Sequence, residues 1–196
     1  MIPALRPCVF FDRDGVVNAD PHPARYVTSP EAFYLFPGFV RALRVVRDKG
    51  WMAVLITNQK GVATGAIPPG MLERIHGHMA DLLMSEGLAF DAIYACTHTE
   101  ADACDCRKPK PGSILRAARE QGVDLANSWM IGDSPRDMEA GRAAGCHTLM
   151  VGPKTGGEAE VRLPEIDDLA GWLDAHLAPQ CPDSPAHRRP PPPQSV

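Results

Sequence analysis

The chain has no long apolar run, no excess of positive charge and no internal repeat. Its 196 residues carry a formal net charge of −4, so it offers no basic surface of the kind that binds nucleic acid. No stretch approaches the roughly 20 apolar residues of a membrane span. The segment before the first apolar run, Met1 to Arg6, is too short for a signal peptide. We therefore expect a cytoplasmic protein whose partners include neither nucleic acid nor a membrane.

Length and composition predict one folded domain. The hydrophobic fraction of 44% and the charged fraction of 22% are ordinary for a globular protein of this size. From Pro179 onward the composition changes to Pro, Ser, His and Arg and ends near four consecutive prolines, which cannot bury a core. We predict a single domain over residues 1–178 and a disordered, proline-rich tail over residues 179–196.

Short apolar runs alternate with stretches of helical periodicity. The runs predict strands over residues 8–11, 51–56, 90–96, 129–131 and 147–151, and the periodic stretches predict helices over residues 37–49, 71–86, 112–121, 135–144 and 169–177. In the third helix we expect Ile114, Leu115 and Ala118 to face inward. Such alternation is typical of an α/β domain with a Rossmann-like parallel sheet that helices cover on both faces.

Two carboxylates follow the first predicted strand. Asp12 and Asp14 come directly after the run Cys8 to Phe11, and Gly15 lets the chain turn. Ligands of open parallel sheets bind outside the carboxyl ends of the strands. There, two acids can hold a hard cation, or one can attack a substrate while the other moves protons. The simpler alternative is a plain turn, in which Asp and Gly are common.

Three other predicted strands end in polar groups as well. Thr57 follows the second strand, Arg107 and Lys108 follow the third at some distance, and Asp133 follows the fourth. Because all strand ends of a parallel sheet lie on one edge, these groups converge with the two acids. Acids, a hydroxyl and a lysine around one point suit a phosphoryl group with a magnesium ion.

The order of these residues resembles that of the haloacid dehalogenase (HAD) phosphohydrolases, from about residue 7 to residue 152. The family motifs correspond to D-x-D-G at residues 12–15, Thr57, Lys108 and G-D-x-x-x-D at residues 132–137. The resemblance implies that Asp12 is the nucleophile, that Asp14 is the general acid and base, and that Thr57 and Lys108 hold the phosphoryl oxygens. It also implies that Mg²⁺ is bound by Asp12, Asp133 and the backbone carbonyl of Asp14.

Several neighbouring residues allow two interpretations. Ser134 to Asp137 fits a helix start, so we expect Asp137 to cap a helix and support the site rather than to bind the metal directly. Lys110 is the rival of Lys108 as the phosphate-binding lysine. His76 and His78 are expected on the surface of the second helix, since residues two apart do not share a helix face.

A second cluster has the spacing of a metal site. Cys96, His98, Cys104 and Cys106 supply three sulfurs and one imidazole within eleven residues, which predicts a closed, four-coordinate structural zinc site. Buried cysteines that merely follow a strand are the alternative. The metal would fix the loop that delivers Lys108. The other cysteines are expected in the core, as Cys8 and Cys146, or in the tail, as Cys181.

This zinc loop, with Thr57-Asn58-Gln59, resembles that of a small HAD subgroup, subfamily IIIA, which contains heptose-bisphosphate and histidinol-phosphate phosphatases. The insertions are too short for a cap domain, so we expect an open site, specificity loops at residues 18–30, 59–66 and 98–107, and a monomer. The resemblance implies removal of the 7-phosphate of D-glycero-D-manno-heptose 1,7-bisphosphate. Substrate-binding residues would be Arg107, Asn58, Gln59 and Arg25. Histidinol phosphate, another sugar phosphate, or a non-catalytic binding protein on the same fold are the alternatives.

Overall fold

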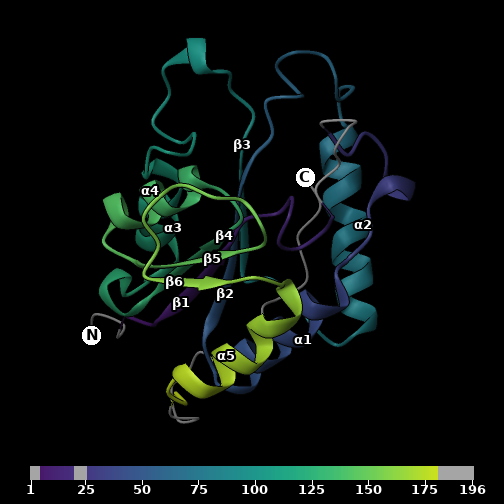
Figure 1. Cartoon of the computed structure of the whole chain (residues 1–196). Helices are drawn as coiled ribbons and strands as arrows, with labels where there is room; N and C mark the ends of the chain where they lie inside the picture. Colours follow the sequence, from purple (N-terminus) through teal and green to yellow (C-terminus); the bar gives the residue numbers. More distant parts are fainter. Residues whose placement is uncertain (1–4, 20–25, 181–196) are drawn as a thin grey trace.

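Six parallel strands form one sheet at the centre of the structure, a computed structural model that describes residues 5–19 and 26–180 (Figure 1). The strand order is β3-β2-β1-β4-β5-β6. The strands are β1 (Cys8–Phe11), β2 (Met52–Asn58), β3 (Ala92–Cys96), β4 (Trp129–Gly132), β5 (His147–Val151) and β6 (Val161–Leu163). β1 lies between β2 and β4, at the point where the order of the strands reverses. Ligands of doubly wound sheets bind at this point.

Five helices cover the two faces of the sheet, as the sequence predicted. They are α1 (Pro37–Asp48), α2 (Met71–Ser85), α3 (Gly112–Gln121), α4 (Pro135–Ala144) and α5 (Leu169–His176). Helices α1, α2 and α5 contribute to one apolar cluster and α3 and α4 to the other. In β1 the side chains alternate between them: Val9 and Phe11 join the first cluster, and Cys8 and Phe10 the second.

Two details of the predicted fold are wrong. Leu115 is 39% exposed, whereas Ile114 and Ala117 are buried. Residues three apart share a helix face, so the side chain of Leu115, one residue after Ile114, is rotated away from the sheet. Strand β6 was not predicted. It has only three residues, too few to show a period, and it forms by pairing with the exposed edge of β5.

No cap domain appears in the part of the chain that the structure describes, in agreement with the short predicted insertions. Near the end of the fold, Gln180 donates its backbone N–H to the carbonyl of Lys49 (2.8 Å), and the Trp51 indole donates to the carbonyl of Ala178 (2.8 Å). The rest of the predicted tail, including Cys181, and Arg25 in the first loop lie outside the described residues. Across residues 5–19 and 26–180, no helix is long and apolar enough to cross a membrane.

Candidate active site

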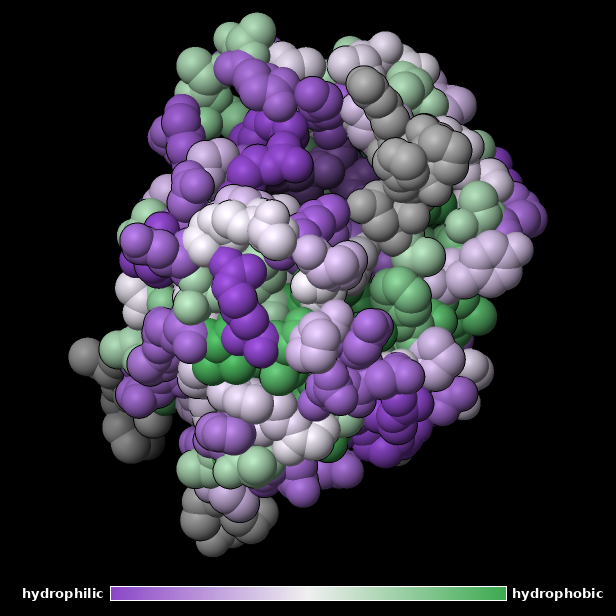
Figure 2. All heavy atoms as spheres, in the orientation of Figure 1, coloured by the Kyte–Doolittle hydropathy of each residue, from purple (hydrophilic) through white to green (hydrophobic). Residues whose placement is uncertain are grey.

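The carboxyl ends of the strands open into a polar cleft of about 290 Å³. Its lining includes four carboxylates and five cationic side chains, drawn from the ends of the strands, from the loops that follow them and from the first turn of α4. Figure 2 shows hydrophilic side chains gathered in a hollow on this side of the molecule. The acids Asp12, Asp14 and Asp133, which the sequence predicted to meet here, do converge on this cleft.

Asp12 extends the central strand into this cleft. Its backbone N–H donates to the carbonyl of Ile131 (2.9 Å), which continues the β1–β4 ladder and fixes the position of the side chain. One carboxylate oxygen lies 2.8 Å from Lys108 Nζ. Burial raises the pKa of Asp12 to about 7 against the attraction of Lys108, and the nearby Asp137 adds to the increase. A cation at this position would favour the ionised, nucleophilic form.

Lys108 is a buried cation whose ammonium group has an acceptor for every proton. Its ammonium contacts Asp12 (2.8 Å), Asp137 (2.6 Å) and the carbonyl of Ile56 (2.8 Å), one acceptor for each of its three protons. Burial lowers the pKa of this ammonium, but the attraction of the two carboxylates outweighs burial and raises the pKa above its usual value. The rival Lys110 instead donates to the carbonyls of the cysteine-containing loop (Ala103 and Cys104), so geometry favours Lys108.

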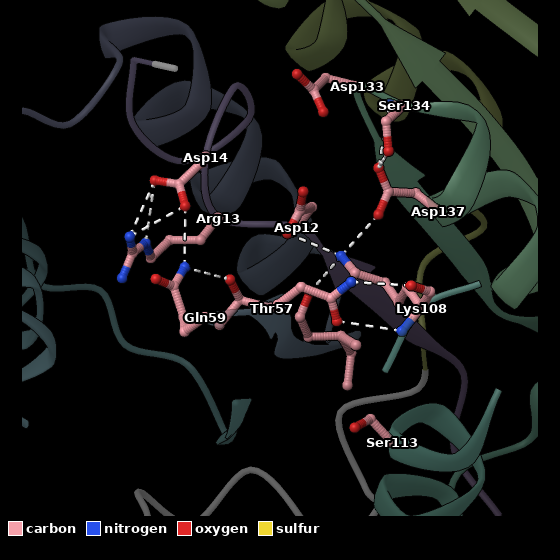
Figure 3. A network of polar contacts seen from close by, with 12 residues as sticks. Asp12, Arg13, Asp14, Thr57, Gln59, Lys108, Ser113, Asp133, Ser134 and Asp137 are labelled. Atoms are coloured by element: carbon pink, nitrogen blue, oxygen red, sulfur yellow. Dashed lines mark hydrogen bonds and ion pairs between the residues drawn. The ribbon is translucent and has the colours of Figure 1, made fainter. Parts of the chain in front are cut away.

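The polar residues at the end of β2 form hydrogen bonds with Lys108 and with Asp14. Asn58 forms two hydrogen bonds with the backbone of Lys108, one through each end of its amide (3.0 and 3.1 Å). Gln59 Nε2 donates to Thr57 Oγ1 and to Asp14 Oδ2, both at 2.9 Å (Figure 3). Asn58 and Gln59 thus orient Lys108 and Asp14, a use of these amides that the sequence did not predict.

Three carboxylates form a cluster suited to a divalent cation. Oxygens of Asp12, Asp133 and Asp137 all lie within 4.8 Å of one another. Glycine makes this approach possible, because a Cβ on Gly15, whose φ is +88°, would collide with the carboxylate of Asp133, and a Cβ on Gly132 with Asp137. Oxygen ligands of this kind suit Mg²⁺. The side chain of Asp14 lies outside the cluster and turns away from Asp12 (Figure 3).

Asp137 caps α4, as the sequence predicted. Its Oδ2 accepts from the hydroxyl (2.6 Å) and the backbone N–H (3.1 Å) of Ser134, which forms a capping box. The sequence did not predict that the other oxygen would bind Lys108. It also did not predict the ion pair between Lys154 Nζ and Asp133 Oδ2 (2.5 Å). Lys154 follows β5 by three residues, and this position at the carboxyl edge of the sheet could have predicted that it lines the cleft.

The four predicted zinc ligands lie together. Five of the six distances among their Sγ and Nδ1 atoms are between 3.1 and 3.7 Å. In a tetrahedron with Zn–S bonds of about 2.3 Å and a Zn–N bond of about 2.0 Å, ligand atoms are separated by roughly 3.5–3.8 Å. The donor set of Cys96, His98, Cys104 and Cys106 therefore fits zinc, and Cys8 and Cys146 lie buried in the core as expected.

Comparisons with known proteins agree on one family. Residues 105–170 match the HAD-hydrolase-like family model. Over 180 residues the chain is 36% identical to the D-glycero-beta-D-manno-heptose-1,7-bisphosphate 7-phosphatase of Pseudomonas aeruginosa, a match that covers 88% of this chain and 98% of that protein. It is 40% identical over 175 residues to the enzyme of the same name from Bordetella bronchiseptica, covering 86% and 97%. The chain belongs to this family of HAD phosphatases.

A solved structure supports the same assignment. The D,D-heptose 1,7-bisphosphate phosphatase from B. bronchiseptica, crystallised with magnesium and phosphate, superposes with a TM-score of 0.75 at 35% identity and covers 85% of this chain and 97% of that chain. Family, fold and cleft therefore identify this chain as a phosphatase of the capless HAD type.

Arg107 lines the phosphatase cleft next to Lys108. Its guanidinium is largely buried and donates to Glu100 Oε1 (2.8 Å) and to the carbonyl of His98 (3.5 Å). Glu100 also pairs with Lys60 (3.3 Å). Its own backbone N–H lowers the pKa of Glu100 to about 2, together with hydrogen bonds from Arg107 and Lys60. Glu100, which the sequence did not single out, holds both cations at the cleft of the phosphatase.

His76 is not a simple surface residue, contrary to the sequence prediction. It lies on α2, partly buried, with Nε2 3.4 Å from Nη1 of Arg13. Burial lowers the pKa of His76 to about 4, and the adjacent Arg13 guanidinium contributes. The sequence could not show this contact, because it depends on how α2 packs over the turn after β1.

This pKa shift predicts a stability change in weak acid. Between pH 6.5 and 4 the unfolded state binds a proton on His76 and the folded state does not. The free energy of unfolding is therefore unaffected by protonation of His76 above pH 6.5 and decreases as the pH falls below it. The slope from one proton is at most about 1.4 kcal/mol per pH unit. In urea unfolding, the free energy of unfolding should decrease less between pH 7 and pH 5 for His76→Gln than for wild type. His78→Gln is the control on the same helix. An equal decrease in the free energy of unfolding in all three proteins would contradict the lowered pKa of His76.

Proposed function

We propose that this phosphatase hydrolyses a phosphomonoester through an aspartyl-phosphate on Asp12, and that its substrate is D-glycero-D-manno-heptose 1,7-bisphosphate, from which it removes the 7-phosphate. The observation that carries the chemistry is the position of Asp12. It lies at the end of the central strand, 2.8 Å from the buried ammonium of Lys108 and within the cluster formed with Asp133 and Asp137.

In the first half-reaction a carboxylate oxygen of Asp12 attacks phosphorus. The bond from phosphorus to the leaving oxygen breaks, and Asp14 gives that oxygen its proton. In the second half-reaction Asp14 takes a proton from water as the water oxygen attacks phosphorus, and the bond to Asp12 breaks. Thr57 and Lys108 hold the phosphoryl oxygens as charge develops on them, and the ammonium of Lys108 exchanges one of its three present acceptors for the substrate.

The carboxylate cluster fits Mg²⁺, and we propose Asp12, Asp133 and the backbone carbonyl of Asp14 as its ligands. When bound, the ion offsets the negative charge of the phosphoryl group and of the three clustered acids. Asp137 is engaged by Ser134 and Lys108, so we assign it to the orientation of Lys108. The cluster of three cysteines and one histidine is proposed to hold structural Zn²⁺, which would fix the loop preceding Arg107.

The charge of the cleft supports a substrate with two phosphates when a divalent cation is bound, because five cations, four carboxylates and Mg²⁺ would together carry a formal charge of +3. Its cationic side chains are Lys60, Arg107, Lys108, Arg136 and Lys154. A sugar bisphosphate carries about three to four negative charges near pH 7, whereas a monophosphate carries about two at most. Arg107 is proposed to contact the substrate, and Asn58 and Gln59 to act on it through Lys108 and Asp14. The predicted role of Arg25 remains a prediction outside the described residues.

The substrate proposal is tested by phosphate release with magnesium from the heptose 1,7-bisphosphate and from histidinol phosphate side by side. We expect kcat/KM to be at least about 100-fold higher for the heptose, because each extra ion pair in a partly desolvated cleft contributes on the order of 1–2 kcal/mol. The heptose 7-phosphate is the matched control for the second phosphate. Preference for histidinol phosphate would overturn the substrate and leave the chemistry of Asp12 intact.

A further inference from the structure

The residue between the two acids of the D-x-D-G motif has an unexpected environment. Arg13 is completely buried, with 0% of its surface exposed. A buried guanidinium is very costly unless it is paired and hydrogen-bonded. Its partner is the adjacent acid: Nη2 lies 3.0 Å from both oxygens of Asp14, and Nε lies 3.3 Å from Oδ1. The backbone between them is fixed as well, since the carbonyl of Arg13 accepts from the N–H groups of Val17 (2.8 Å) and Asn18 (3.1 Å).

Two buried amides complete the set of donors around Asp14. Asn18 Nδ2 donates to Oδ1 (3.0 Å) and Gln59 Nε2 donates to Oδ2 (2.9 Å). Within the described residues, the amide oxygens of Asn18 and Gln59 have no hydrogen-bond partner. An unsatisfied buried acceptor is unfavourable, so both amides direct their N–H groups to Asp14 at the expense of their own oxygens.

Together these donors fix the orientation of the Asp14 carboxyl group. A carboxylate has about four lone-pair positions, and the five contacts from Arg13, Asn18 and Gln59 are enough to fill them. The side chain of Asp14 is nevertheless 25% exposed and lines the cleft. The contacts therefore hold the carboxyl group in one orientation at the edge of the cleft, where the proposed proton transfer takes place.

We propose that Arg13 is a positioning residue for the proton-transfer step of this phosphatase. It fixes the rotamer of Asp14 through a bidentate contact and makes no contact with substrate itself. His76 lies behind the guanidinium at 3.4 Å and, being neutral near pH 7, can accept from it without adding a second positive charge. This inference rests on the proposed role of Asp14 and adds the element that orients it.

A test must separate loss of proton transfer from general structural damage. The first step, transfer to Asp12, determines kcat/KM, and it needs a proton donor only when the leaving group is a poor one, such as an alkyl alcohol. A p-nitrophenolate group leaves without protonation. The variants are Arg13→Met, which removes the charge at similar length, and Arg13→Lys, which keeps the charge but loses the bidentate fork. Arg116→Gln, at an exposed arginine on α3, is the control.

We expect both Arg13 variants to lower kcat/KM for the heptose bisphosphate by about 100-fold, within the range for general acid catalysis, and for p-nitrophenyl phosphate by less than about 5-fold. His76→Gln should change the same ratio in the same direction by a smaller factor. Equal losses on both substrates, or no loss on either, would overturn the proposal. If Arg13→Met does not fold, Arg13→Lys and His76→Gln decide the question.

The failure of this inference is distinguishable from failure of the proposed function. If Asp12→Asn retains turnover, the aspartyl-phosphate mechanism is wrong. If Asp12→Asn is inactive and the Arg13 variants lose both substrates equally, the mechanism stands and only the positioning role of Arg13 is rejected.

Discussion

Replacement of Asp12 by Asn is expected to lower kcat by about 10⁵-fold or more, the scale on which removal of a covalent nucleophile acts. Asn has nearly the same shape as Asp, but its amide does not attack phosphorus. Lys108 keeps two of its three acceptors, Asp137 and the carbonyl of Ile56, so the variant should fold. The measurement is phosphate release at saturating substrate, with circular dichroism and thermal unfolding as checks on the fold.

Asp14→Asn provides the matched comparison for the nucleophile. With p-nitrophenyl phosphate the first step needs no acid, but the second step still needs a base for water. This variant should therefore accumulate phosphoryl-enzyme, which intact-protein mass spectrometry would detect as one added phosphoryl group, removable by hydroxylamine. Asp12→Asn should show none. A variant Asp12→Asn that retains activity within tenfold of wild type, or that still becomes phosphorylated, would refute the assignment.

Loss of the proposed zinc site is expected to have the second largest effect. Cys104 is only partly buried, so Cys104→Ser removes little packing, yet it breaks a four-coordinate site. We expect zinc content to fall from one ion per chain to well below one. A loss of about 3 kcal/mol would lower Tm by roughly 10 °C in a domain of this size. Activity should fall at least about 100-fold, because Lys108 follows Cys106 by two residues and loses its anchored loop.

The control for this experiment is another cysteine of the same chain. Cys146 is buried in the core and remote from the cluster, so Cys146→Ala should cost about 1–2 kcal/mol through lost packing while retaining zinc and Mg²⁺-dependent activity. Elemental analysis and thermal unfolding of both variants make the comparison. Wild-type protein that contains well under one zinc per chain, or a Cys104→Ser variant with unchanged Tm and activity, would reject the zinc site.

The sequence by itself determined the framework of this protein. Short apolar runs that alternate with helical patterns predict a parallel sheet, since only that arrangement buries both faces of such strands. The strand ends then share one edge, which is why Asp12, Asp14 and Asp133 could be placed together without coordinates. The cluster of the proposed zinc site could be predicted for a similar reason, because its three cysteines and one histidine lie within eleven residues and their spacing is local.

Only the tertiary structure decided how side chains from different elements pair. The sequence identifies Asp137 as a helix cap. Its second carboxylate oxygen contacts Lys108 because α4 and the loop after Cys106 meet at the carboxyl edge of the sheet. In the sequence, Arg13 is only the residue between the two acids of the D-x-D-G motif. Its burial depends on the packing of α2, which carries His76, against the turn after β1. These contacts depend on the directions of side chains far apart in the chain, which hydrophobic periodicity does not encode.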